Sequence, residues 1–175
     1  MNPQEILDAI PRLNQTFTSP KIFLWENFYF LAVTDALYSE AEELAKRISQ
    51  ISRGKRTVIL CENSEVVGKL GEFVVKEFCD QYLDCPWSSM VREVNSQGGD
   101  RCDLQICGLN VDVKTRSLHP DVRTGSPHAD VTIASNFDLR VSHDSRYPQR
   151  HQDLYILAGY CPMTRYGYCF GWCTW

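Results

Sequence analysis

One stretch constrains the fold more than any other part of the sequence: residues 102–115, CDLQICGLNVDVKT. Its two halves alternate aliphatic and polar residues, which is the period of a half-buried β-strand. The central Gly-Leu pair suits a two-residue type II′ turn, because glycine tolerates the positive φ that this turn needs at its first position. The hairpin closed by that turn places Gln105 opposite Asp112 and Asp103 opposite Lys114.

This register predicts a face that is entirely polar. The aliphatic side chains share one face, and the other face carries Asp103, Gln105, Asp112, Lys114 and, further along the second strand, Arg116. Asp103 and Asp112 become diagonal neighbours, roughly 7 Å apart at Cβ. Two carboxylates at that spacing can lean towards one Mg²⁺ ion, which prefers oxygen ligands and keeps several waters. The alternative is a solvated hairpin face on which Asp103 and Lys114 form a weak cross-strand ion pair.

The arrangement resembles a known motif. An acid that opens one strand, followed by acid-x-lysine on the next, is similar to the PD-(D/E)XK nuclease superfamily, the restriction-endonuclease-like group that includes Holliday-junction resolvases. The resemblance implies that Asp103 and Asp112 bind Mg²⁺ (or Mn²⁺) and that Lys114 assists the attacking water. A glutamate on the preceding helix often completes such sites, and Glu72 in GKLGEFVVKEF (68–78) is the candidate third catalytic and metal-binding acid.

The resemblance implies a Mg²⁺-dependent DNA endonuclease, with Gln105 and Arg116 as candidate substrate-binding residues on the same face. Many relatives act as dimers, so a homodimer is a further possibility. The sequence departs from the family pattern where Cys102 stands in place of the usual proline and where the second acid, Asp112, is the shorter choice. These departures, with a net charge of -4, motivate the alternative of an inactive nuclease-fold module that binds nucleic acid or a protein partner.

The remaining sequence predicts an α/β fold of the restriction-endonuclease-like type, with a mixed central sheet flanked by helices. Residues 1–60 are expected to form an N-terminal helical extension, with a long helix from about 21 to 52, and residues 61–175 the nuclease core. Ser64 is a plausible N-cap for a helix over 65–83. Further strands are expected at 89–95, 129–135, 153–160 and 166–175, and most of 116–150 is expected to be loop.

Composition limits the setting of the protein. The chain of 175 residues is 43% apolar and 23% charged, as globular domains usually are. Its longest apolar run is broken by Glu26 and Asn27, so no membrane span is expected. Eight cysteines without a secretory signal indicate a reducing, cytoplasmic setting. No pair has the C-x-x-C spacing, which favours buried thiols over a zinc or iron–sulfur site but leaves that site open.

Two basic clusters bear on a nucleic-acid partner. Residues 46–56 carry five lysines and arginines without an acid, and residues 118–151 hold all four histidines and several arginines. Each cluster suits a phosphate-contacting surface. Each also suits a solvated face or a polar loop, and the sequence leaves both interpretations open.

Overall fold

A computed structural model describes residues 21–52, 62–83, 85–91, 102–118 and 152–174. These residues form six strands and two helices. In chain order they are β1 (Lys21–Ala32), α2 (Asp35–Ser52), α3 (Glu62–Tyr82), β2 (Trp87–Ser89), β3 (Leu104–Ile106), β4 (Leu109–Ser117), β5 (Leu154–Cys161) and β6 (Tyr166–Thr174).

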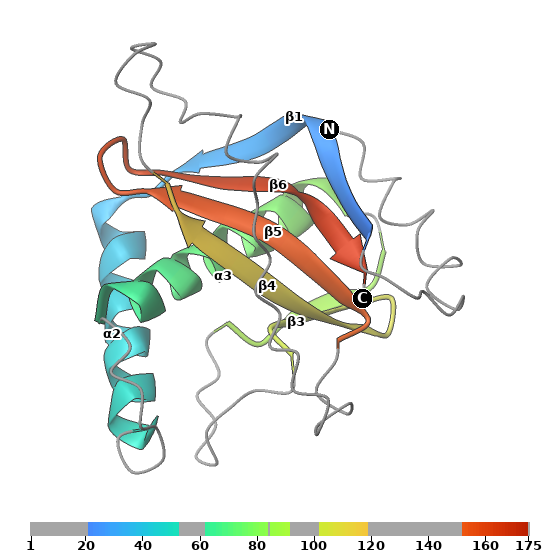
Figure 1. Cartoon of the computed structure of the whole chain (residues 1–175). Coiled ribbons are helices and arrows are strands. Elements are labelled where there is room, and N and C mark those ends of the chain that lie inside the picture. Colours follow the sequence, from blue (N-terminus) through green and yellow to red (C-terminus); the bar gives the residue numbers. More distant parts are fainter. Residues whose placement is uncertain (1–20, 53–61, 84, 92–101, 119–151, 175) are drawn as a thin grey trace.

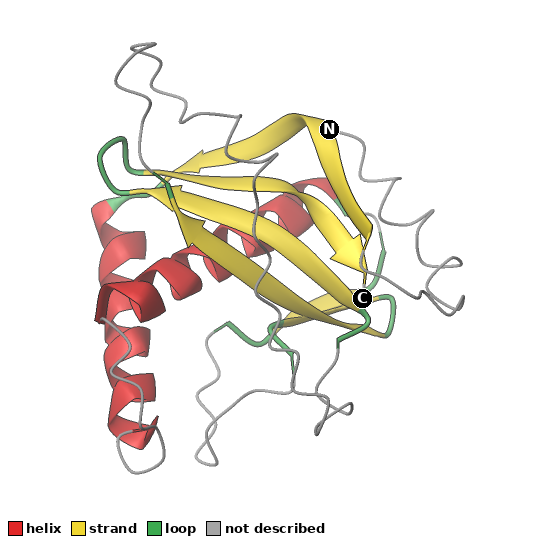
Figure 2. Ribbon diagram, in the orientation of Figure 1, coloured by secondary structure: helices red, strands yellow, loops and turns green. Residues whose placement is uncertain are grey.

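The strands form one curled, mixed sheet in the order β1-β6-β5-β4-β3-β2 (Figure 1). β4 and β5 run parallel, and every other neighbouring pair is antiparallel. α3 crosses one face of the sheet, and α2 packs against α3 (Figure 2). The expected α/β class with a mixed sheet and flanking helices is therefore confirmed.

The central strand β5 explains why the sheet needs cover on both faces. All eight of its side chains are buried, as its nearly continuous apolar sequence predicts. On the α3 side, Ile156 packs in a cluster that includes Val74 and Phe78 of the helix. On the opposite face, Tyr155 and Leu157 pack in a second buried cluster with residues of β6.

A glycine sets the distance between α3 and β4. A Cβ placed on Gly71 would collide with the side chain of Thr115. The Thr115 hydroxyl also donates a hydrogen bond to the Gly68 carbonyl, at 3.4 Å. Gly71 therefore lets the helix pack close to the sheet, and the next residue, Glu72, lies near β4.

The predicted helix from 21 to 52 is wrong in its first half, where β1 pairs with β6 along the edge of the sheet. The helix α2 begins only at Asp35, after Thr34, whose hydroxyl accepts the Leu37 N–H at 3.2 Å as an N-cap. Aromatic and aliphatic residues dominate KIFLWENFYFLA, and their pairing with a strand distant in sequence outweighs local helix propensity. The expected boundary at residue 60 falls outside the described residues.

Other expectations concern the middle of the chain. The helix predicted over 65–83 is confirmed as α3, although it begins at Glu62, so Ser64 lies inside its first turn and is not its N-cap. The strands expected at 153–160 and 166–175 are confirmed as β5 and β6. Of the strand expected at 89–95, residue 89 ends β2, residues 90 and 91 are not in a strand, and residues 92–95 lie outside the described residues. The strand expected at 129–135, most of the expected loop and the four histidines lie outside the described residues. Neither described helix is long and apolar enough to cross a membrane.

Candidate functional site

The β3–β4 hairpin turns one residue earlier than the sequence predicts. Its two loop residues are Cys107 and Gly108, with φ of 50° and 82°, the pair of positive values that a type I′ turn requires. Gln105 therefore pairs with Asn110 and not with Asp112. The predicted register is wrong by two residues. A shift of two keeps every side chain on its expected face and changes only its partner.

Contacts outside the hairpin account for this register. The Cys107 N–H donates to the Pro86 carbonyl at 2.8 Å, next to β2. The Asn110 N–H donates to the Asp153 carboxylate at 2.8 Å, at the start of β5. These two bonds hold the turn from both sides. Cys107 adopts a left-handed conformation that is uncommon for residues other than glycine, asparagine and aspartate.

The observed register brings the two aspartates together. Asp103 lies just before β3, and its N–H donates to the Val111 carbonyl at 2.9 Å. Its carboxylate accepts the next free N–H of β4, that of Val113, at 2.7 Å. The side chains of Asp103 and Asp112 are also hydrogen-bonded to each other. The two carboxyl groups therefore lie within hydrogen-bond distance, closer than the diagonal relation that the sequence predicts.

The electrostatics of Asp103 reflect this crowding of acids. Burial, the largest cause, and the negative charges of Glu72 and Asp112 together raise the pKa of Asp103 to about 8. The hydrogen bond from the Val113 N–H acts in the opposite direction. At neutral pH, Asp103 therefore stays protonated, and its carboxyl O–H donates a hydrogen bond to Asp112. A bound cation would take over the role of that proton and favour the ionised pair.

Glu72 approaches the pair from α3. It is buried, and its carboxylate accepts a hydrogen bond from the equally buried Lys69 ammonium at 2.6 Å. Because the two residues lie three apart on one helix, they face the same direction. Sequence analysis missed Lys69, although its spacing from the candidate glutamate on a helix was a readable signal.

Lys114 stands on the polar face of β4, two residues after Asp112, and forms an ion pair with that aspartate. Its ammonium also lies 5.7 Å from the centre of the Tyr155 ring on β5, within the range of a cation–π contact. Tyr155 pairs directly with Asp112 in the parallel register. Sequence analysis missed this tyrosine, because only the β4–β5 pairing brings it beside the lysine.

The two candidate substrate-binding residues occupy the same side of the hairpin. Gln105 is exposed, and its amide donates to Asn110 at 3.1 Å. Arg116 is exposed and lies on β4 two residues beyond Lys114. The structure does not bring Gln105 opposite Asp112, and the substrate-binding roles of both residues stay predictions.

The donor set suits a cation held by few protein ligands. Within the described ranges, no three His, Cys, Asp or Glu side chains are grouped so that they could hold a metal ion. Mg²⁺, however, is commonly bound by one or two carboxylates and completes its shell with water. Asp103 and Asp112 supply such a pair, and Glu72 lies near enough to affect the charge of Asp103.

No protein-family model, curated protein or solved structure matches this chain.

The cysteines behave as ordinary buried thiols where they are described. Five of the seven described free cysteines are buried: Cys79, Cys102, Cys161, Cys169 and Cys173. Burial raises the pKa of Cys79 and of Cys173 to about 12, so these two thiols stay protonated at neutral pH. A protonated thiol is a poor metal ligand and a poor nucleophile.

Proposed function

We propose that the protein is a Mg²⁺-dependent DNA endonuclease with a restriction-endonuclease-like active site. The observation that carries this proposal is the half-buried, hydrogen-bonded Asp103–Asp112 pair, with Lys114 paired to Asp112 and the charge of Glu72 acting on Asp103. Gathering acids until one of them holds its proton at neutral pH is unfavourable for folding. Such arrangements are concentrated at functional sites.

The two aspartates would hold Mg²⁺ or Mn²⁺, and Glu72 would bind a water of the metal or add a ligand. When bound, the metal polarises a phosphoryl oxygen and makes a coordinated water more acidic. The lysine of the motif, Lys114, would turn from Asp112 towards the attacking water and offset the negative charge that develops on the phosphate. Lys69 would hold the carboxylate of Glu72 in a fixed direction through their hydrogen bond.

A solvated hairpin explains the same alternation of residues but not the burial. An ion pair on an exposed face contributes little and demands no particular neighbours. Here the acid that opens β3 is half-buried, is hydrogen-bonded to a second acid on β4 and feels the charge of a third on α3. This arrangement favours a site for a cation over a surface feature.

One observation favours the inactive module as a second candidate. Without a metal, two of the three acids already have lysine partners, Asp112 with Lys114 and Glu72 with Lys69. Such internal compensation would let the fold persist as a binding module without turnover. In that case the protein would bind nucleic acid or a protein partner equally well with and without Mg²⁺.

Cleavage assays test the proposal directly. We expect the purified protein to cut plasmid, branched or single-stranded DNA in Mg²⁺ or Mn²⁺ and not in EDTA. Asp112→Asn and Lys114→Met should each lower the rate by about 100-fold or more, in line with the loss of a metal ligand or of a group that stabilises the transition state. The matched controls are Asp80→Asn and Lys76→Met, which remove a carboxylate and an ammonium paired on the outer side of α3.

The controls should cut at the wild-type rate. The proposal fails if no DNA substrate is cut, or if the Asp112 and Lys114 variants cut as fast as the Asp80 and Lys76 variants.

A further inference from the structure

Tyr155 lies beside the lysine of the candidate site. On β4, Val111 and Val113 pack on the α3 side of the sheet. The residues that alternate with them, Asp112 and Lys114, therefore face the other side. There Lys114 forms an ion pair with Asp112, and its ammonium lies over the Tyr155 ring, 5.7 Å from the ring centre. Lys114 thus has a charged and an aromatic neighbour.

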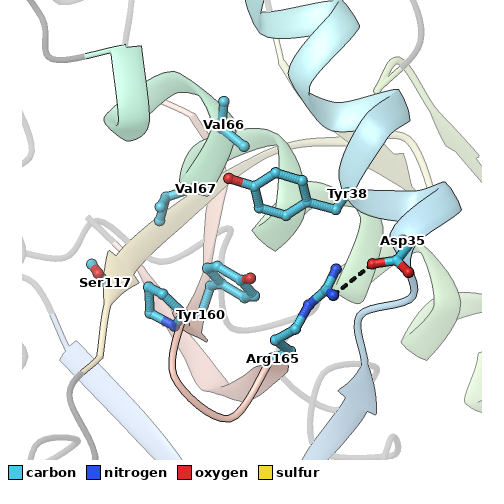
Figure 3. Close-up of a pocket in the computed structure, with 8 residues that line it drawn as sticks. Asp35, Tyr38, Val66, Val67, Ser117, Tyr160 and Arg165 are labelled. Atoms are coloured by element: carbon cyan, nitrogen blue, oxygen red, sulfur yellow. Dashed lines mark hydrogen bonds and ion pairs between the residues drawn. The ribbon is translucent and has the colours of Figure 1, made fainter.

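The two faces of β5 have different surroundings. Tyr160 packs on the helix side, where its ring lies 6.4 Å from that of Tyr38 on α2, and both rings line a cavity of about 540 Å³ (Figure 3). Tyr155 packs on the opposite side, in the cluster with β6. Five residues separate the two tyrosines of β5, and an odd separation on a strand puts side chains on opposite faces. Of these three tyrosines, Tyr155 alone lies on the face of Lys114.

The Tyr155 ring is a fixed surface. It is 2% exposed and packs in a cluster that includes Leu157 of its own strand and Tyr168 of β6. Its hydroxyl accepts the Gln152 N–H at 3.3 Å. A ring held in this way cannot follow a moving lysine and is too deeply buried to contact DNA itself. Any effect of Tyr155 on the reaction must therefore act through Lys114, whose ammonium lies over it.

A metal at the aspartates would compete with Lys114 for Asp112. The two cations would share one carboxylate, and like charges at that distance repel each other. Lysine has a flexible four-carbon chain, and the Lys114 side chain is 36% exposed. Once Asp112 turns to the metal, the ion pair no longer holds the ammonium at the site.

The aromatic contact can persist through this exchange. The ring attracts the ammonium through the negative charge of its π face. Burial, the largest cause, raises the pKa of the Tyr155 phenol, so the side chain stays neutral at neutral pH and does not compete for the metal as a carboxylate does. Cys173 pairs with Tyr155 from β6 and is also neutral, because burial raises the pKa of its thiol to about 12.

We propose that Tyr155 is a positioning residue: the face of its ring holds the Lys114 ammonium beside the aspartates when a divalent cation takes Asp112 from the lysine. This inference rests on the proposed nuclease function and adds a residue to its site. The ammonium meets the attacking water, and the tyrosine acts only on the ammonium. The face of the ring is therefore essential, and its hydroxyl is dispensable.

The position of the Lys114 ammonium can be measured without cleavage. Reductive ¹³C-methylation of the full chain gives each lysine its own NMR signal, and the Lys114 signal is the one missing from Lys114→Met. A group over the face of an aromatic ring resonates upfield. In Asp112→Asn, which removes the ion pair without a metal, the Lys114 signal in EDTA should stay upfield. In Asp112→Asn with Tyr155→Leu it should move to the position of an exposed lysine such as Lys46.

Cleavage tests the same contact in the metal-bound protein. Tyr155→Leu should lower kcat by about 5- to 30-fold, and Tyr155→Phe should restore it to within about 2-fold of wild type, because phenylalanine keeps the cation–π contact. The matched control is Tyr168→Leu, which truncates a tyrosine of the same buried cluster and should keep the wild-type kcat. All rates are measured well below the melting temperature of each variant, so that only folded protein is compared.

Two further comparisons exclude a general loss of packing. Phenylalanine with successive fluorine atoms in place of Tyr155 keeps the size of the ring and weakens the negative charge of its face, so kcat should fall stepwise along the series even if Tyr155→Leu does not fold. In the Lys114→Met background, Tyr155→Leu should lower kcat by no more than about 2-fold, because the residue through which it acts is gone. A purely structural tyrosine would give an equal loss in both backgrounds.

The outcomes separate this proposal from the nuclease proposal. If DNA is cut but the fluorinated series is flat, or the loss is the same with and without Lys114, Tyr155 has no positioning role and the nuclease proposal stands. If no DNA is cut, the nuclease proposal fails and the Lys114 signal decides on Tyr155. An upfield signal in Asp112→Asn that Tyr155→Leu abolishes supports the contact, and an exposed-lysine signal there overturns it.

Discussion

Asp103 contributes both to the fold and to the proposed chemistry. Its carboxylate completes the hydrogen-bond ladder of β4 at Val113, where β3 has ended, and touches the other acid of the motif. The pKa of about 8 means that the folded protein holds a proton there which an unfolded chain releases near its ordinary value of 3.8. Asp103 therefore couples stability to pH when no metal is bound.

We expect the metal-free protein to lose stability as the pH rises from about 5 to about 8. In this range the folded protein still binds a proton at Asp103, whereas the unfolded chain has released it, so a rise in pH favours unfolding. Asp103→Asn mimics the protonated acid, so it should lack this part of the slope. At pH 8 it should be more stable than wild type by on the order of 5 kcal/mol. Urea denaturation in EDTA at both pH values measures this difference.

The control is Asp80→Asn, an exposed acid on α3, which should keep the wild-type slope. Equal slopes for wild type and Asp103→Asn would contradict the account of Asp103.

At the scale of elements, the contact between α3 and β4 positions the third acid. Gly71 lets the helix backbone lie against Thr115, and Glu72 follows on the same turn. Gly68, one turn earlier, has nothing within 4 Å of the place where a Cβ would stand. The two glycines of one helix therefore have different roles, although they look equivalent in the sequence.

This contrast predicts opposite effects of the same substitution. Gly71→Ala should destabilise the protein by about 1–3 kcal/mol, because the new methyl group overpacks against Thr115, and it should lower cleavage by displacing Glu72. Gly68→Ala should stabilise the protein by up to about 1 kcal/mol, because alanine is the better helix former. Urea denaturation of the two variants beside wild type measures both signs. Two variants of equal stability would contradict the close contact.

On the scale of the whole molecule, a cation at the aspartates should stabilise the native state, because the unfolded chain has no such site. At a Mg²⁺ concentration about 100 times its dissociation constant, the gain is about 2.7 kcal/mol. For a chain of this size that corresponds to a rise in melting temperature of several degrees. We expect Asp103→Asn and Asp112→Asn to lose this rise and Asp80→Asn to keep it. An equal rise in all four proteins would place the cation elsewhere.

The sequence predicts correctly which residues share each face of the hairpin, but not which residues pair across its two strands. Alternation with a period of two survives a slip of two residues, so Asp103, Asp112 and Lys114 share the polar face in either register. The register itself depends on contacts with Pro86 and Asp153, which lie outside the hairpin. Local sequence carries no signal for those contacts, so the turn was placed one residue too late.

The same limit explains what was missed at greater distances. The prediction of a helix over β1 is wrong because the pairing that makes this segment a strand is with β6, at the other end of the sequence. The cavity lined by Tyr38, Ser117 and Arg165, among others, draws its walls from four separate segments, and neither Tyr38 nor Arg165 belongs to a recognisable motif. Lys69 is different, since its spacing from Glu72 on a helix was visible in the sequence.

The pairing of β1 with β6 has a consequence for how the protein is made. Among the described strands, β1 is the first to leave the ribosome, and its only partner is the last. At about 5–20 residues per second, the intervening chain of about 130 residues takes on the order of ten seconds to synthesise. During that time β1 lacks the strand with which it pairs in the folded sheet. The edge of the sheet formed by β1 therefore closes only once translation has reached β6.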